Sequence, residues 1–539
     1  MRVLAIHLRP IMLVAAAVLY AERLAAEDDG SAIRFNDVTK QSGLIEPLAG
    51  LLGHGAAVGD YDSDGDLDIY VGGFGDRPDS EYSPAKGPVS NRLLRNIGGG
   101  RFEAIGMPAV EFYGRTSGAV LADLNNDGML DLYVANNAKT RAQQTKEPQQ
   151  SAATLRSKVY RNDNGQFVDI SQQSGACPPS LHTARNVGVL DYNADGLLDL
   201  FVVEDRFTSQ PRSALLKNLG SMRFQDSNLS AGVPDDIFGL GYAVADLNDD
   251  LLPDFFVAHS NRLFLSDGKG AYREAVKLRE VFRWNPLDGE DWPCGAAFGD
   301  LNGDGRLDLV LSIHGVKARN RVFINEGSDN GVPRFRDRTQ AVGLGEVVPV
   351  RCPHVEVQDF DNDGRMDIYI STGWLKGGVF TPLIYRNVGL RDGLPYFMPP
   401  RPIKPPMVYY PAGPSGDFNS DGRLDLFLVN WFNGNHSRLL QNESDGGRWL
   451  DVQVVGRTIN RMGIGSKVRV YRGGEVGNKG SLLGVQEIAV GYGYASGQAA
   501  VCHFGLGDRT MVDVEVQLGN GDVWRQTGVK SNQRIVVRE

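Results

Sequence analysis

Aspartate is the residue whose spacing carries the most chemistry in this chain. The nine residues from Asp60 to Asp68 place carboxylates at positions 1, 3, 5 and 9 of a short segment, with glycine at position 6. Oxygen ligands at alternate positions of a tight loop converge on one point, and glycine permits the sharp reversal of the backbone. The spacing therefore predicts a binding site for a hard divalent cation.

The same nine-residue pattern occurs seven times along the chain, starting at Asp60, Asp123, Asp191, Asp246, Asp300, Asp359 and Asp417. In each loop we expect ligands from the side chains at positions 1, 3 and 5, from the carbonyl oxygen of position 7, and from both oxygens of the Asp at position 9. The predicted ligands are Asp60, Asp62, Asp64, Asp66, Asp68, Asp123, Asn125, Asp127, Met129, Asp131, Asp191, Asn193, Asp195, Leu197, Asp199, Asp246, Asn248, Asp250, Asp254, Asp300, Asn302, Asp304, Arg306, Asp308, Asp359, Asp361, Asp363, Arg365, Asp367, Asp417, Asn419, Asp421, Arg423 and Asp425.

Calcium is the cation that this set of ligands favours. About six or seven oxygens suit calcium, whereas magnesium prefers six ligands and keeps several waters. An EF-hand would need Glu at position 12 and flanking helices, and these loops have Asp at position 9 and strand-like flanks. A solvated acidic turn explains any single loop, because Asp, Asn and Gly favour turns, but it does not explain seven copies of the position-9 Asp.

Charge repulsion supports the same interpretation. Positions 1, 3, 5 and 9 of the seven loops hold 23 Asp and 5 Asn, and the whole chain has a formal charge of −10. Seven divalent ions would change that charge from −10 to +4. We expect the ions chiefly to stabilise the fold, because each would lock one turn and link metal binding to folding.

The fourth loop departs from the pattern. Leu251 replaces the glycine at position 6 and Pro253 stands at position 8. Leucine is strained at positive φ, so we expect this site to be the weakest or empty.

The spacing of the loops predicts the unit that positions them. Successive loops start 63, 68, 55, 54, 59 and 58 residues apart, which is one supersecondary unit per repeat. Small apolar runs such as 55–60 precede the loops, β-branched and aromatic runs such as 68–73 follow them, and Asn/Gly hairpin signals separate two further strands. Four strands per unit and seven units predict an all-β chain with a seven-bladed β-propeller. The segment 33–39 resembles a fourth strand, so we expect it to complete the last blade; the alternative is a leading arm.

The two ends of the chain differ from the repeats. Residues 1–26 have the Arg-flanked short apolar run and small residues of a cleavable secretory signal, which predicts a secreted protein, extracellular or periplasmic, without membrane insertion after cleavage.

Four cysteines are too few for a disulfide scaffold and lack metal spacing. Cys294 with Cys352 is the preferred pairing, and buried free thiols are an equal alternative.

The repeats resemble the FG-GAP/VCBS blades of integrin α-chain-type propellers, through their loops, flanking strands and copy number, and this assigns 27–442 to the propeller. Residues 443–539 resemble the ASPIC/UnbV domain, through 449–452, 460–465, 491–494 and 504–507. The pairing of both modules resembles the cartilage acidic protein family, and implies calcium binding and extracellular interaction. The alternation of apolar and polar residues in 443–539 independently predicts a small β-sandwich or barrel docked on the propeller.

Two classes of function remain open. Aromatic and Arg side chains on the long connections favour a module that binds an extracellular protein or glycan; they are Phe112, Tyr113, Arg115, Trp284, Trp292, Trp374, Tyr409, Tyr410, Trp431 and Phe432. For any single one of them, ordinary packing of the loops over the propeller face is the favoured alternative, so it is the group that supports binding. The net negative charge argues against nucleic acid as the partner. The alternative is an extracellular or periplasmic enzyme, a hydrolase, lyase or metal-dependent enzyme, with a site at the channel mouth. It would be built from His54, His182 and His354 with Glu290 or Asp291. A compact histidine cluster at the channel mouth would favour the enzyme.

Overall fold

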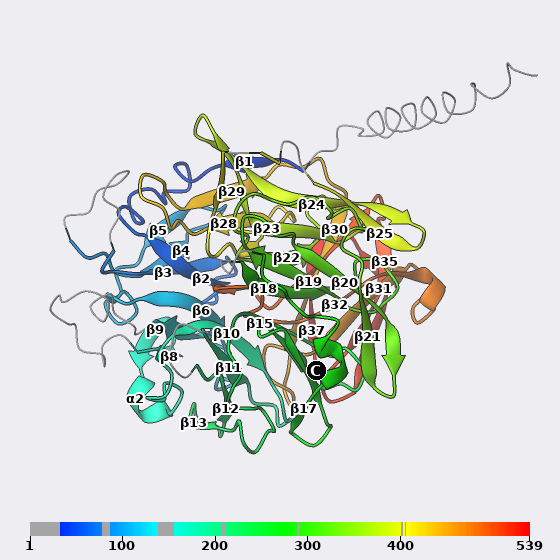
Figure 1. Cartoon of the computed structure of the whole chain (residues 1–539), viewed down its shortest axis with the longest axis horizontal. Coiled ribbons are helices and arrows are strands. Elements are labelled where there is room, and N and C mark those ends of the chain that lie inside the picture. Colours follow the sequence, from blue (N-terminus) through cyan, green and yellow to red (C-terminus); the bar gives the residue numbers. More distant parts are fainter. Residues whose placement is uncertain are drawn as a thin grey trace, which may run out of the picture.

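A computed structural model describes residues 33–77, 87–137, 156–205, 211–287, 291–399, 403–404 and 406–539. Strands dominate these residues, and they surround a common centre when the molecule is viewed down its shortest axis (Figure 1). The helical segments are single turns: α2 (Ser171–Ser174), η3 (Val276–Arg279) and η4 (Lys479–Ser481). The prediction of an all-β chain is confirmed.

The described residues form seven propeller sheets, each of which carries one aspartate loop between its first two strands. The first sheet contains β2 (Gly53–Gly59), β3 (Asp68–Gly73), β4 (Arg92–Asn96) and β5 (Phe102–Ala104), and the second contains β6 (Thr116–Ala122), β7 (Asp131–Asn136), β8 (Lys158–Asp163) and β9 (Gln166–Asp169). The third contains β10 (Ala184–Leu190), β11 (Asp199–Glu204), β12 (Ala214–Asn218) and β13 (Phe224–Asp226), and the fourth β14 (Gly239–Ala245), β15 (Asp254–His259), β16 (Arg262–Ser266) and β17 (Tyr272–Glu274).

The remaining propeller sheets follow the same antiparallel order. The fifth contains β18 (Trp292–Gly299), β19 (Asp308–His314), β20 (Arg321–Asp329) and β21 (Val332–Asp337). The sixth contains β22 (Val355–Gln358), β23 (Asp367–Lys376), β24 (Val379–Arg391) and β25 (Leu394–Met398), with β26 (Met407–Tyr409) added beside β23. The seventh contains β27 (Ser415–Gly416), β28 (Asp425–Leu428), β29 (Arg438–Asn442) and β1 (Phe35–Asp37).

Small residues let the inner strands crowd around the axis. A Cβ on Gly55 of β2 would lie 2.7 Å from the backbone nitrogen of Gly118 in β6, and a Cβ on Gly118 would lie 2.7 Å from the carbonyl oxygen of Arg185 in β10. The first, second and third sheets therefore touch backbone to backbone at the centre, and larger residues would push them apart.

The first and last propeller sheets also pack on each other. Val58 and Val71 of the first sheet share a buried cluster with Phe427 and Val429 at the seventh. Strand β1 pairs with β29, with Phe35 opposite Asn442 and Asp37 opposite Leu440 (Figure 1). The predicted completion of the last sheet by the start of the chain is confirmed, and the pairing covers an edge strand. Together these contacts give the arrangement of a β-propeller.

The C-terminal residues form two further sheets. One contains β30 (Arg448–Val455), β34 (Cys502–Gly507) and β37 (Gln533–Arg538), and the other β31 (Lys467–Arg472), β32 (Leu482–Glu487), β35 (Met511–Gln517) and β36 (Val523–Lys530). Their inner faces share one apolar core, which includes Leu450, Val470 and Val514. This is a small sandwich, consistent with the alternating pattern of the sequence.

The C-terminal part also sends a segment into the middle of the propeller. Strand β33 (Ser496–Gly497) pairs in parallel with β2, and Gly493 forms bridges with Tyr242 and Ala296 on the fourth and fifth sheets. We call residues 488–498 the plug. The sequence predicted docking of the C-terminal domain, but not this insertion.

Two expectations concern the remaining segments. All four cysteines are free thiols in the structure, so the predicted Cys294–Cys352 disulfide is not formed. The predicted signal, residues 1–26, lies outside the described residues. Among the described residues, helices are too short and too polar to cross a membrane.

Candidate metal centres and the central channel

The seven aspartate loops share one backbone geometry. In the first loop, Asp60 accepts the N–H of Asp64 on Oδ1 at 3.0 Å and the N–H of Gly65 on Oδ2 at 3.0 Å. The position-1 Asp makes the same pair of bonds in the other six loops. The position-1 carboxylate therefore shapes every loop before any ion is considered.

The position-9 carboxylates are buried and use both oxygens within the protein. Asp68 accepts the N–H of Tyr61 on Oδ2 at 3.1 Å and the N–H of Asn96 on Oδ1 at 2.8 Å. Equivalent bonds hold Asp131, Asp199, Asp254, Asp308, Asp367 and Asp425. This residue links the loop to the third strand of its sheet, in addition to the metal role predicted for it.

Burial makes the negative charge of these loops costly. It raises the pKa of Asp68 and of Asp131 to about 8, and the pKa of Asp300 to about 7. The same cause raises the pKa of Asp191 and of Asp417 to about 6. A divalent cation would reverse this penalty, because an adjacent positive charge favours the ionised carboxylate.

The position-3 side chains supply acceptors that have no donor. Asp62 Oδ1, Asn193 Oδ1 and Asp361 Oδ1 are buried and accept no hydrogen bond. A buried acceptor without a partner is costly in a native fold, and a bound ion would satisfy it. Carboxylate oxygens of Asp60, Asp62 and Asp68 lie within 4.8 Å of one another, as do those of Asp359, Asp361 and Asp363. The donor set of the first and sixth loops therefore fits a calcium ion.

The loops with Asn at position 3 have an internal donor instead. Asn125 Nδ2 donates to Asp127 Oδ2 at 2.8 Å, and the other four Asn loops repeat this bond. Aspartate at position 3 has no such donor to offer. The first and sixth loops therefore hold one more carboxylate than the Asn loops at positions 1, 3, 5 and 9. In the sixth loop, Arg386 partly balances it, lying 2.6 Å from Asp361 Oδ2 and 3.6 Å from Asp363 Oδ2.

The position-7 residues were predicted to act through their carbonyl oxygens, and three of them also act through their side chains. The guanidinium of Arg423 donates to Asp421 Oδ2 at 2.5 Å and to the carbonyl oxygen of Asn442 at 2.8 Å. Arg306 and Arg365 make the same contacts in the fifth and sixth loops. Each arginine partly neutralises the position-5 carboxylate and ties the loop to the third strand of its sheet.

The fourth loop adopts the shared geometry despite its sequence. Leu251 has φ +74°, a left-handed conformation that leucine rarely adopts. A cation from the C-terminal domain lies against this loop: Lys467 Nζ is 3.2 Å from Asp246 Oδ2 and 2.6 Å from Asp249 Oδ1. Glu487 accepts the N–H of Asp246 at 2.9 Å. The weak or empty calcium site expected here stays a prediction.

A recurring asparagine in the third strand of the sheets is a structural residue that the sequence analysis missed. Asn96 Nδ2 donates to the carbonyl oxygen of Leu67 in its own sheet and to that of Phe418 in the seventh sheet. Asn162, Asn218, Asn387 and Asn442 likewise donate to the preceding sheet. The recurrence of Asn at this position in the repeats was the available signal.

Position 4 of the loops was also overlooked, and it contacts the C-terminal domain. Asn126 Oδ1 accepts the N–H of Arg461 at 2.9 Å. Asp249 binds Lys467, as described above, and Asn362 Oδ1 lies 2.7 Å from Nε2 of His503. The C-terminal domain therefore docks on the face that carries the metal loops.

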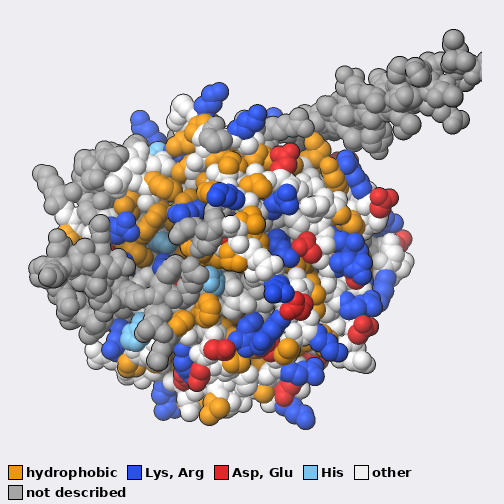
Figure 2. All heavy atoms as spheres, in the orientation of Figure 1, with side chains coloured by type: hydrophobic (Ala, Val, Ile, Leu, Met, Phe, Trp, Pro, Cys, Tyr) orange, Lys and Arg blue, Asp and Glu red, His pale blue; other side chains and the backbone are white. Residues whose placement is uncertain are grey.

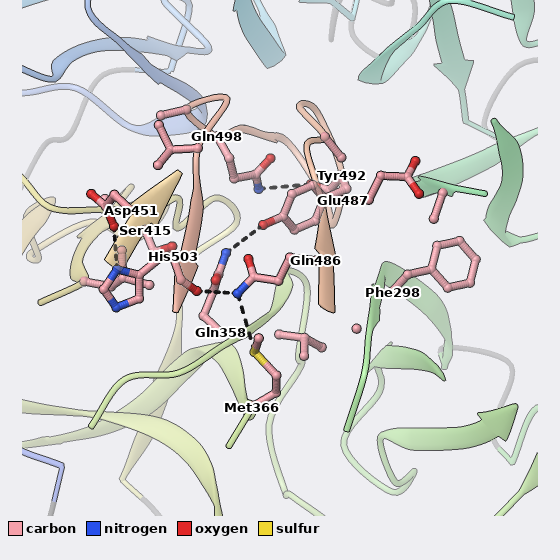
Figure 3. Close-up of a pocket in the computed structure, with 18 of the residues that line it drawn as sticks. Phe298, Gln358, Met366, Ser415, Asp451, Gln486, Glu487, Tyr492, Gln498 and His503 are labelled. Carbon is pink, nitrogen blue, oxygen red and sulfur yellow. Dashed lines mark hydrogen bonds and ion pairs between the residues drawn. The ribbon is translucent and has the colours of Figure 1, made fainter. Parts of the chain in front are cut away.

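The plug closes the channel through polar contacts with the inner strands. His354 Nδ1 accepts the N–H of Tyr494 at 3.0 Å, and its Nε2 donates to Glu356 at 3.0 Å. Gln498 donates to the same carboxylate at 2.9 Å, and Ser415 also donates to it. Gln358 donates to the hydroxyl of Tyr492 at 3.2 Å, and Gln498 donates to the carbonyl oxygen of Tyr492 at 3.3 Å (Figure 3). These three residues line a cavity of about 90 Å³. The channel is thus lined jointly by the propeller and the C-terminal domain.

The histidines of the enzyme hypothesis lie in different surroundings. His54 is buried, its Nδ1 donating to the carbonyl oxygen of Ser117 and its Nε2 accepting from the hydroxyl of Tyr494 at 3.3 Å. His354 binds the plug and His182 is exposed. Asp291 is buried and accepts the N–H of Leu287, while Glu290 lies outside the described residues. The structure does not bring His54, His182 and His354 together as one cluster.

Most of the predicted binding aromatics lie on the face opposite the metal loops, but two belong to the core. Trp374 and Tyr410 are buried, and Tyr410 Oη accepts from Arg438 at 2.8 Å. Trp431 packs on His54 and Phe74, with ring centroids 5.0 and 4.9 Å apart. Tyr113 is 55% exposed. The group therefore divides into core residues, a central aromatic cluster and exposed rim residues.

Acidification is expected to destabilise the protein through His54. Burial, aided by Arg185, lowers the pKa of His54 to about 3. Below pH 6.5 the His54 imidazole is protonated in the unfolded chain but stays neutral in the folded chain. The free energy of unfolding therefore falls between pH 6.5 and pH 3, by about 2 kcal/mol at pH 5. Chemical denaturation of a His54→Gln variant should show a shallower decline over this range, whereas exposed His182→Gln should decline as the parent does. Parallel declines for the parent and His54→Gln would contradict the assignment.

Comparisons with known proteins agree with both modules. Residues 78–134 and 246–311 match the family described as FG-GAP-like repeat, and residues 456–539 match the family described as ASPIC and UnbV. The chain is 26% identical to Cartilage acidic protein 1 of Mus musculus over 497 residues, which is 87% of this chain and 71% of that protein. The human protein of that name is also 26% identical, over 87% of this chain and 69% of its own length.

A solved structure of an Agrocybe aegerita lectin, which recognises non-reducing terminal N-acetylglucosamine, aligns with 65% of this chain and 80% of its own, at a TM-score of 0.39 and 19% identity. From the family matches and the relatives, the chain combines FG-GAP-like repeats in a β-propeller with an ASPIC/UnbV segment, and it is similar to Cartilage acidic protein 1 over most of its length.

Proposed function

We propose that this protein is a secreted, calcium-stabilised β-propeller that binds an extracellular protein or glycan. The observation that carries the calcium proposal is the set of buried position-3 oxygens without donors, Asp62 Oδ1, Asn193 Oδ1 and Asp361 Oδ1, in loops whose other carboxylates already shape the turn. Bound calcium would supply the positive charge that these acceptors lack. It would stabilise the folded state, since the unfolded chain offers no assembled site.

The location of the C-terminal domain suggests which face binds the partner. Docking contacts at Asn126, Asp249 and Asn362 cover the metal-loop face. The opposite face carries the long connections between strands, where Tyr113 is exposed and Trp431 lies near Arg77, 5.0 Å from ring centroid to guanidinium carbon. Figure 2 shows hydrophobic side chains over much of the face that it presents, with Lys and Arg side chains among them. Aromatic and Arg side chains of this kind dominate recognition surfaces.

Metal analysis of the purified mature chain tests the calcium part of the proposal. We expect several calcium ions per chain, up to one for each of the seven loops, and calorimetric titration should favour calcium over magnesium. A folded sample free of calcium, whose melting temperature does not change when calcium is added, would contradict the proposal.

The binding part is tested separately. Capture from extracellular fractions and a glycan array, both in calcium, should identify a ligand that is lost when the face opposite the metal loops is altered. Absence of any ligand, together with turnover in a screen for hydrolases and lyases, would favour the enzyme alternative instead.

A further inference from the structure

A groove of about 750 Å³ lies at the fifth sheet, on the face opposite the metal loops. Three segments form its walls: 283–287 from the connection between the fourth and fifth sheets, 317–321 at the start of β20, and 337–341 after β21. Because the C-terminal domain docks on the other face, it leaves this groove accessible.

The charge of the groove opposes the charge of the chain. Its lining contains five cationic residues, Arg283, Lys317, Arg319, Arg321 and Arg338, and one acidic residue, Asp337. Asp337 pairs with Arg321, and Glu280 and Glu326, outside the lining, pair with Arg283 and Arg338, so the positive charge of the groove is reduced but still in excess. The whole chain has a formal charge of −10. Exposed Arg319 makes no ion pair with any residue that the structure describes. A local excess of positive charge attracts an anionic ligand to this surface, even though the protein as a whole is negatively charged.

Hydrogen bonds hold the groove in shape. Arg321 donates to Asp337 Oδ2 at 2.7 Å and to the carbonyl oxygen of Arg283 at 3.1 Å, which connects all three walls. Asp337 also accepts from Thr339 at 2.6 Å, which fixes the third wall. Trp284 donates from its indole nitrogen to the carbonyl oxygen of Asp291 at 3.1 Å, so its ring has a fixed orientation at the edge of the groove. A ligand would meet a largely preformed surface.

We propose that this groove binds an anionic glycan, one that carries carboxylate or sulfate groups. This inference rests on the binding function proposed above and names its ligand class. Arginine forks match the oxygen pairs of carboxylate and sulfate groups. The indole of Trp284 provides a flat apolar surface against which a sugar ring can pack.

Other polyanions fit the groove less well. The phosphate backbone of a nucleic acid would extend beyond the groove onto an acidic protein, and its affinity depends on many distributed cations. An acidic peptide would find the arginines, but an extended peptide gains most of its affinity by pairing with a strand edge. The three walls present side chains to the ligand rather than a strand edge, and the flat indole of Trp284 suits a sugar ring better than a peptide.

The test uses the full mature chain in calcium at physiological ionic strength. Its probes are a heparin-derived oligosaccharide for sulfate, an oligogalacturonate for carboxylate, a neutral dextran oligosaccharide and a poly-glutamate peptide. The groove variant Arg283→Ala with Arg319→Ala is compared with Arg223→Ala with Arg273→Ala. The control also removes two exposed arginines, from the third and fourth sheets, outside the groove lining.

We expect at least one anionic glycan to bind and the dextran to fail. The groove variant should lower the affinity about tenfold or more, while the control variant stays within about twofold of the parent, and added salt should weaken binding. Equal losses in both variants would show nonspecific attraction and overturn the inference. Tighter binding of poly-glutamate than of either anionic glycan would overturn it in favour of an acidic peptide. If no polyanion binds while another ligand is captured on a different surface, the inference fails and the proposed binding function stands.

Discussion

Replacing Asp62 with alanine is expected to destabilise the protein in calcium and to leave its stability unchanged, or slightly increased, in a chelator. Asp62 Oδ1 is buried without a donor, and the partner of Oδ2 is Arg95, 3.9 Å away in an exposed ion pair. Such a pair contributes little to stability. We therefore expect the side chain to stabilise the protein mainly by binding a cation. Without a cation, its negative charge adds to the repulsion within its loop.

The expected size follows from the coupling of binding to folding. A site filled at a hundred times its dissociation constant adds about 2.7 kcal/mol to the free energy of unfolding, so loss of the first loop should cost about 2 to 3 kcal/mol in calcium. Denaturant titration in calcium and in chelator measures both values.

Asp508→Ala is the matched control for this experiment, because it removes an exposed carboxylate outside the loops. It should change the free energy of unfolding by less than about 0.5 kcal/mol in both conditions. If Asp62→Ala loses the same free energy in calcium and in chelator, the residue has a structural role and the metal assignment of the first loop is wrong.

The propeller could be predicted from sequence because each repeat is marked by residues with few structural roles, above all the Asp, Asn and Gly of the loops. Seven aspartate loops, each followed by a buried apolar strand, leave one economical solution, a sheet for each repeat. The strand at Phe35–Asp37 could be placed in the seventh sheet because it resembles the fourth strands, which precede each repeat elsewhere. When a pattern repeats within one chain, its copies can be compared with one another, and the positions that recur show which residues define the unit.

What escaped prediction depends on contacts between distant segments. The Asn96 amide joins the first sheet to the seventh, 322 residues away in sequence, and Asn126 meets Arg461 across 335 residues. In a hairpin or an acidic loop, asparagine is typical of a turn. Local sequence therefore does not indicate that its side chain also bonds to a residue far away in the chain. Trp374 and Tyr410 are buried, as the packing alternative for single aromatics allowed. Local sequence could not separate them from the exposed aromatics, because burial depends on which elements cover a segment.

The plug is the clearest example of such a long-range feature. Its sequence, Gly491-Tyr492-Gly493-Tyr494, supported the resemblance to the ASPIC/UnbV domain, yet nothing in its composition indicates that it enters the propeller. In the structure it contacts the third, fourth and fifth sheets: Gly491 approaches Val187, and Gly493 forms bridges with Tyr242 and Ala296. One segment thereby connects several propeller sheets to the C-terminal domain.

Replacing Gly493 with alanine should therefore be among the most damaging single substitutions in the chain. A Cβ there would lie 2.4 Å from the His354 ring and 2.8 Å from the carbonyl oxygen of Val355, and the residue has φ +79°. Both obstacles are held in place, since His354 binds Glu356 and Val355 belongs to β22. We expect a loss of more than about 3 kcal/mol in the free energy of unfolding, because the methyl group must displace either the plug or an inner strand.

Gly477→Ala separates the cost of conformation from the cost of the clash. Gly477 has nearly the same backbone angle, φ +80°, but a Cβ there meets no atom within 4 Å. Its substitution should cost about 1 kcal/mol, the usual strain of a side chain at positive φ. The difference between the two variants then measures how firmly the plug is held. Equal losses would mean that the channel yields to an added methyl group, and that the C-terminal domain is retained by its contacts with the metal loops rather than by insertion into the propeller.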